Sequence, residues 1–190
     1  MKPPEGKKYE PVKEGTHLAV CISVIDLGEQ PDDFNEGQTK RMIRLEWELT
    51  KLKRDDGKNQ IVSKEYSYYY SEKSNLYADL TSWLGKEFHS RYNIADVIGK
   101  ACLLSITHKT SKAGNIYAKV SNVSQLIEGI MVPEPTYSFT IFDMENFDDK
   151  TYRSLAQFVK NKISNSKEYK TINGTYKQGA PENDDDDIPF

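Results

Sequence analysis

Long apolar runs are missing from this sequence of 190 residues. No stretch of about 18 apolar residues occurs, so we expect no membrane-spanning helix. Residues 1–14 combine proline with lysine and glutamate and contain no apolar run. They therefore predict a loose arm rather than a signal peptide.

Cysteine and histidine are equally scarce. The two cysteines, Cys21 and Cys102, lie within apolar runs, which predicts buried, reduced thiols in a cytoplasmic protein rather than a disulfide. The three histidines, His17, His89 and His108, lie far apart and lack the spacing of metal ligands. Neither a P-loop nor an HExxH motif occurs. We therefore expect no metal, no cofactor and no catalytic activity.

Aspartate and glutamate are missing between Asp96 and Glu128 but are concentrated near the C-terminus. Glu182 and the run from Asp184 to Asp187 supply five negative charges within six residues. Without these five charges, the net charge of −3 becomes +2 for residues 1–181. Such asymmetry predicts a body that meets a polyanion and a tail that does not.

Hydrophobic periodicity predicts a mainly β, α+β domain between residues 15 and 130. Alternating or β-branched segments indicate strands near 16–28, 40–52, 61–70, 99–109 and 115–126. Ser74 and Gly85 bracket a helix between the third and fourth of these strands. This order is that of an OB-fold, a five-stranded barrel with one helix between strands 3 and 4. A generic small α+β sheet is the alternative that periodicity leaves open.

The composition changes after the predicted barrel. Residues 131–169 predict an extended connector and a C-terminal helix that Asp148 or Asp149 can cap. The apolar face of this helix comprises Tyr152, Leu155, Phe158, Val159 and Ile163. The acidic side chains before it, Asp143 and Glu145 among them, are interpreted as cap and dipole residues rather than a metal site. Residues 170–190 predict a disordered acidic tail.

The last seven residues, DDDDIPF, combine features that a fold does not require. Pro189 restricts the backbone, and the terminal carboxylate of Phe190 offers a charge for lysine or arginine to bind. This ending resembles the C-terminal tip of bacterial single-stranded DNA-binding proteins, which docks replication, recombination and repair enzymes. The resemblance implies a docking role for Asp185, Asp186, Asp187, Ile188, Pro189 and Phe190. A solvated acidic tail that aids solubility is the alternative.

The body differs from the usual bacterial protein of that family, which has a long glycine- and glutamine-rich linker after its barrel. The segments EGTHLAVCISVIDLG, LEWEL, SNLYADLTSWLGK and IGKACLLSITHK instead resemble small proteins from the replication modules of tailed phages. This resemblance implies a phage protein that acts in the host cytoplasm and carries a host-type docking signal.

Binding of single strands without sequence preference needs cations along the backbone path and aromatic faces for stacking. Three segments supply both: the second strand, the third strand and the last hairpin. The predicted DNA-binding residues are Arg41, Arg44, Lys64, Tyr69, His108, Lys109, Lys112, Tyr117 and Lys119. Tyr69 and Tyr117 are expected to point outward, whereas Trp47 and Trp83 are expected in the core.

Three functions stay open at this point. The favoured one is a single-stranded DNA-binding protein that coats exposed strands and recruits replication enzymes through its tail. The second is an adaptor or decoy that captures host replication proteins without binding DNA. The third is an enzyme such as a recombination nuclease, for which no motif occurs. Self-association is left undecided by the sequence.

Overall fold

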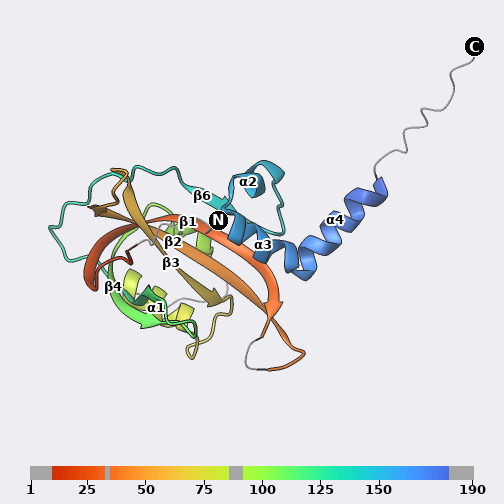
Figure 1. Ribbon diagram of the computed structural model, residues 1–190, viewed down its shortest axis with the longest axis horizontal. Helices are drawn as coiled ribbons and strands as arrows, with labels where there is room; N and C mark the ends of the chain where they lie inside the picture. The colour runs from red at the N-terminus through yellow and green to blue at the C-terminus, as the bar shows by residue number, and fades with distance from the viewer. Residues whose placement is uncertain (1–9, 33–34, 86–91, 180–190) are drawn as a thin grey trace, which may run out of the picture.

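A computed structural model describes residues 10–32, 35–85 and 92–179, with side chains up to Gly174. The fold is mainly β: an antiparallel sheet forms its centre, short helices lie against it, and the far end of α4 extends away from it (Figure 1). The strands are β1 (Gly15–Pro31), β2 (Thr39–Lys53), β3 (Asn59–Ser67), β4 (Ala101–Thr110), β5 (Ile116–Ser124) and β6 (Thr140–Phe142). The helices are α1 (Asn75–Leu84), the 3-10 turn η1 (Ile94–Val97), α2 (Asp149–Ser154), α3 (Gln157–Asn165) and α4 (Lys167–Gly179).

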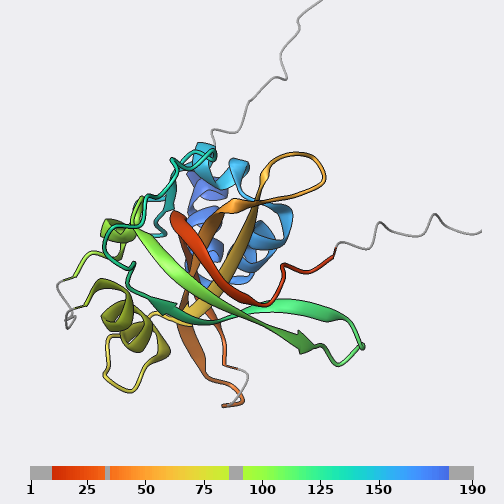
Figure 2. The same cartoon turned by 90° about the vertical axis from the view of Figure 1, so that its left-hand side faces the viewer.

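The sheet is an open path of strands in the order β3-β2-β1-β4-β5. The short β6 pairs in parallel with the second half of β1, whereas β4 pairs with its first half. The two end strands, β3 and β5, contact each other across the core, and α1 contacts both of them. The β4–β5 hairpin extends beyond the rest of the sheet (Figure 2).

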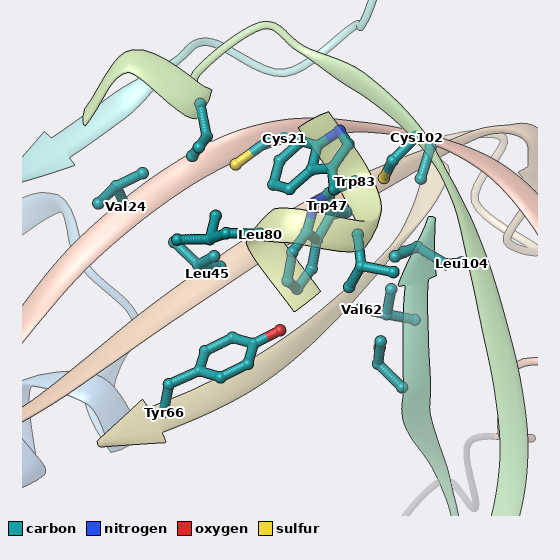
Figure 3. Packing of buried hydrophobic residues seen from close by; sticks show 14 of the residues in the cluster. Cys21, Val24, Leu45, Trp47, Val62, Tyr66, Leu80, Trp83, Cys102 and Leu104 are labelled. Atoms are coloured by element: carbon teal, nitrogen blue, oxygen red, sulfur yellow. The ribbon is translucent and has the colours of Figure 1, made fainter. Parts of the chain in front are cut away.

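The main hydrophobic core lies between the sheet and α1. Trp47 and Trp83 are 0% and 2% exposed, and their ring centroids lie 6.1 Å apart (Figure 3). The predicted core positions of both tryptophans are therefore confirmed. Cys21 and Cys102 are buried in the same core as free thiols, also as predicted. Burial raises the pKa of both thiols, so they stay protonated and unreactive.

A second core lies on the other side of β1. Ile25 and Leu27 of β1 pack there against β6 and the C-terminal helices, together with Phe142, Met144, Leu155, Val159 and Ile163. The first predicted strand is a continuous apolar run because this part of β1 is covered on both faces. Two bulges, between Cys21 and Ser23 and between Asp26 and Gly28, adjust which side chains face each core.

Helix α1 follows the sequence prediction closely. The Ser74 side chain accepts a hydrogen bond from the backbone N–H of Tyr77 and caps the helix. Gly85 ends the helix in the left-handed conformation at φ 66°, as predicted from its position. The buried residues Leu76, Leu80 and Trp83 form its apolar face.

Three terminal predictions need correction. The single predicted C-terminal helix is divided into α2, α3 and α4, because Leu155 and Ser166 have extended backbones. Residues 170–179, predicted to be disordered, continue α4, where Tyr169 and Ile172 pack against the second core. The loose arm is ordered at its end, because Val12 is 8% exposed and belongs to the main core.

Candidate nucleic-acid interface

The β4–β5 hairpin brings three of the predicted DNA-binding residues together. Lys109 lies directly opposite Tyr117 in the antiparallel register, and Lys119 follows two residues later on the same face. The buried Ile106 and Val120 define the core side of the two strands, so these three side chains point away from it. Lys109 and Lys119 are exposed, and Tyr117 is 47% exposed. We call Lys109, Tyr117 and Lys119 the hairpin outer face.

The hairpin outer face is free of negative charge in its own segment. Lys112 adds an exposed cation in the turn between Ser111 and Asn115, whose backbones are hydrogen bonded. No carboxylate occurs in the sequence between Asp96 and Glu128. The hairpin therefore offers three lysines and one open tyrosine ring to a ligand, a combination suited to a phosphate backbone and a stacked base.

His108 lies on the opposite side of the hairpin and contacts the N-terminal arm. Its Nε2 atom is 2.8 Å from the Val12 carbonyl oxygen, and its backbone N–H donates to Glu14 Oε1 at 2.6 Å. The last pair between β1 and β4 is Gly15 with Ile106, so these two bonds continue the support of the hairpin beyond β1. The structure thus places His108 as a support of the hairpin and away from the hairpin outer face.

The two predicted arginines lie elsewhere and are already paired. Arg41 binds Asp26 at 2.5 Å and Glu145 at 2.9 Å, and these bonds raise the pKa of its guanidinium. Arg44 binds Glu46 at 2.7 Å and Glu65 at 3.0 Å. Neither arginine lies on the hairpin outer face.

Arg44 is also covered by the C-terminal helices. Its guanidinium carbon lies 4.8 Å from the ring centroid of Phe158 in α3. One turn further along α3, Lys162 pairs with Glu65 of β3 at 2.5 Å. The outer side of β2 is therefore occupied by protein at this point.

Lys64 points toward the core side of the sheet. It lies opposite Leu45, and its Nζ atom binds Asp79 of α1 at 2.5 Å. The Tyr66 hydroxyl donates to the same carboxylate at 2.8 Å. Because the Lys64 side chain is 19% exposed and paired, its location does not fit the predicted outer groove.

The tyrosines at the end of β3 and just after it face different surroundings. Tyr66 is buried and Tyr69 is 67% exposed, which confirms the predicted outward position of Tyr69. Tyr68 and Tyr70 pack against the main core, with their ring centroids 5.7 Å apart. Tyr69 lies in the segment between β3 and α1 and is not part of the β4–β5 hairpin.

Sequence reasoning missed the buried carboxylate of Glu48 in β2. Glu48 is 0% exposed and accepts hydrogen bonds from the backbone N–H groups of Thr136 and Tyr137. Asn59 and the Thr136 hydroxyl donate to it as well. These hydrogen bonds therefore hold the connector against β2. No local sequence signal marks Glu48, because the main donors lie 88 residues later.

The predicted docking residues Asp185, Asp186, Asp187, Ile188, Pro189 and Phe190 lie outside the described residues. In the part of the chain that is described, no group of histidine, cysteine and carboxylate side chains could hold a metal ion. The described helices include none that is long and apolar enough to cross a membrane. The sequence matches no known protein-family profile and no curated protein.

Proposed function

We propose that this chain is a single-stranded DNA-binding protein of DNA replication or recombination that binds without strong sequence preference. The observation that carries the proposal is the hairpin outer face, where Tyr117 lies opposite Lys109 and next to Lys119 along β5. Lysines attract the phosphate backbone, and an open ring stacks on any base. The contact between β3 and β5 further supports an OB-fold barrel, in which the path of the sheet closes on itself.

The first test removes the ring. Tyr117→Ala is expected to weaken binding of fluorescein-labelled oligo-dT about five- to 150-fold, because stacking contributes about 1–3 kcal/mol per base. Lys109→Ala is expected to weaken binding at low salt and to reduce the slope of log K against log salt by about 0.7. Fluorescence anisotropy at several salt concentrations measures both effects.

Lys150→Ala is the matched control, because Lys150 is an exposed lysine in α2 rather than in the hairpin. It should leave both affinity and slope close to those of the wild type. If Tyr117→Ala and Lys109→Ala bind like the wild type, the hairpin is not the site. If the wild type itself does not bind oligo-dT at low salt, the DNA-binding proposal fails.

The tail carries the second part of the proposal. Its likeness to the docking tip of bacterial single-stranded DNA-binding proteins supports recruitment of replication, recombination and repair proteins. Deletion of Phe190 is expected to abolish capture of such proteins from a host lysate, because the aromatic ring that anchors the tip is lost. Oligo-dT affinity should be unchanged in the same variant. Retained capture would contradict docking through the tip.

The second candidate function is an adaptor that does not bind DNA. One observation favours it: Arg41, Arg44 and Lys64 are all paired with carboxylates of the same chain. An adaptor would need only the tail and a stable body. The oligo-dT titration separates the two candidates, because the adaptor shows no salt-dependent binding.

A further inference from the structure

In OB-folds, the second and third strands commonly form a binding surface. In this protein, other parts of the chain cover the outer side of β2. Arg44 lies under the ring of Phe158, and Glu48 lies under the backbone of residues 136–137. Lys162 joins α3 to Glu65 of β3. A nucleic acid strand on this side would have to displace α3, which is held by the second core, and the connector, which is held by Glu48.

Another part of the outer face, where β4 lies between the start of β1 and β5, presents a different surface. Thr16, Ser105 and Asn122 lie in register across these three strands. Thr107 lies beside Lys119 in the next row, followed by Lys109 beside Tyr117. The flanking residues Leu104 and Ile106 are buried, so Ser105, Thr107 and Lys109 share the outer side of β4.

The side chains of this wall are suited to a polyanion. Thr16, Thr107 and Asn122 are exposed, and each carries a hydroxyl or amide donor. Such donors commonly bind phosphate and sugar oxygens in protein–DNA complexes. Within the rows, Lys109 and Lys119 provide positive charge, and none of the paired positions is a carboxylate. The neighbouring carboxylate of Glu14 accepts the backbone N–H of His108.

We infer that the bound strand runs from the hairpin outer face along β4 toward the start of β1, over Thr107, Ser105, Asn122 and Thr16. This inference rests on the proposed function and assigns the path of the strand on the protein. Tyr117 and the lysines hold one end of the path. The hydroxyl and amide row continues it on the outer side of β4 and β5, whereas α3 packs against β1.

Two identical substitutions test this path, one on the path itself and one on α3. Asn122→Asp changes one exposed amide of the row into a carboxylate of the same shape, and Asn161→Asp does the same on exposed α3. At about 50 mM salt, Asn122→Asp is expected to weaken oligo-dT binding roughly three- to tenfold through repulsion of phosphate. Asn161→Asp should change the affinity less than about twofold. Thermal unfolding of both variants verifies that they remain folded.

A second variant keeps the test informative if Asn122→Asp does not fold. Thr107→Glu places a carboxylate directly opposite Lys119 and should cause a loss of similar or larger size. The path is overturned if affinity falls only in Asn161→Asp, falls equally in the path and α3 variants, or falls in no variant. In each of these cases, binding by the wild type leaves the proposed function standing. Absence of wild-type binding would instead overturn the proposed function and the path with it.

Discussion

Replacing Gly28 with alanine is expected to lower the free energy of unfolding by about 3 kcal/mol. Gly28 has φ 69°, a conformation that side chains other than glycine adopt only with strain. An added Cβ would lie 2.7 Å from Ser166 Cβ and 2.8 Å from Glu168 Oε2. These distances are too short for non-bonded atoms, so α4 would have to move away from β1.

Such a movement breaks several contacts at once. Ser166 is fully buried, and its hydroxyl accepts from the backbone N–H of Tyr169 at the start of α4. Glu168 Oε2 accepts from the backbone N–H of Glu29 at 2.9 Å. The loss therefore exceeds the intrinsic strain of alanine in this conformation.

Gly57→Ala is the control for Gly28→Ala. Gly57 has a similar φ of 78°, but a Cβ there has no atom within 4 Å. It should cost only the conformational strain, about 1 kcal/mol. Urea unfolding followed by circular dichroism measures both variants. Equal losses would show that the close approach of α4 to β1 contributes nothing.

Glu48→Gln is the second substitution with a large expected effect, a loss of about 3 kcal/mol in the free energy of unfolding. The carboxylate accepts from two backbone N–H groups at 2.9 and 3.0 Å and from the Thr136 hydroxyl at 2.9 Å. Glutamine replaces one acceptor oxygen with an NH₂ group, which then faces donors in a buried place. The connector should detach from β2.

Acid should weaken the wild type through the same group. Burial of Glu48 opposes its ionisation, but hydrogen bonds from Asn59, Thr136 and Tyr137 outweigh burial and lower its pKa below the usual 4.5. The unfolded chain therefore binds this proton at a higher pH than the folded chain does. The stabilisation is complete above about pH 4.5 and is lost as the pH falls through the lowered pKa.

Glu46→Gln is the control for Glu48→Gln. Glu46 is the neighbouring outer carboxylate of β2 and is half-buried, with an ion pair to Arg44. Its loss should cost about 1 kcal/mol or less. Urea unfolding between about pH 3 and 7 should show a smaller acid-induced loss for Glu48→Gln than for the wild type. Identical pH profiles would contradict the role assigned to Glu48.

The order of the strands and the position of α1 could be predicted because their signals are local. The alternation of β2 placed Ile43, Leu45, Trp47 and Leu49 on one side, and all four are buried in the main core. Ser74 caps the start of α1 with its side chain, and Gly85 ends the helix in the left-handed conformation that glycine favours.

The pairing of the cations could not be predicted in the same way. Arg41 meets Glu145, a residue 104 positions away, and that contact depends on how the C-terminal segment folds over β1 and β2. The inward position of Lys64 was accessible in principle, because it shares the side of β3 on which Tyr66 is buried. The structure therefore brings together predicted residues that are neighbours in one hairpin and separates those whose partners lie in distant segments.

Strand β1 is a wall shared by two cores, and this arrangement limits how the chain can be divided. The composition changes near residue 130, but removal of everything after that point would leave Ile25 and Leu27 facing water. Exposed apolar side chains on a long strand favour aggregation. The sheet and the helices that follow it thus depend on each other for solubility, so evolution or protein engineering would have to exchange them together.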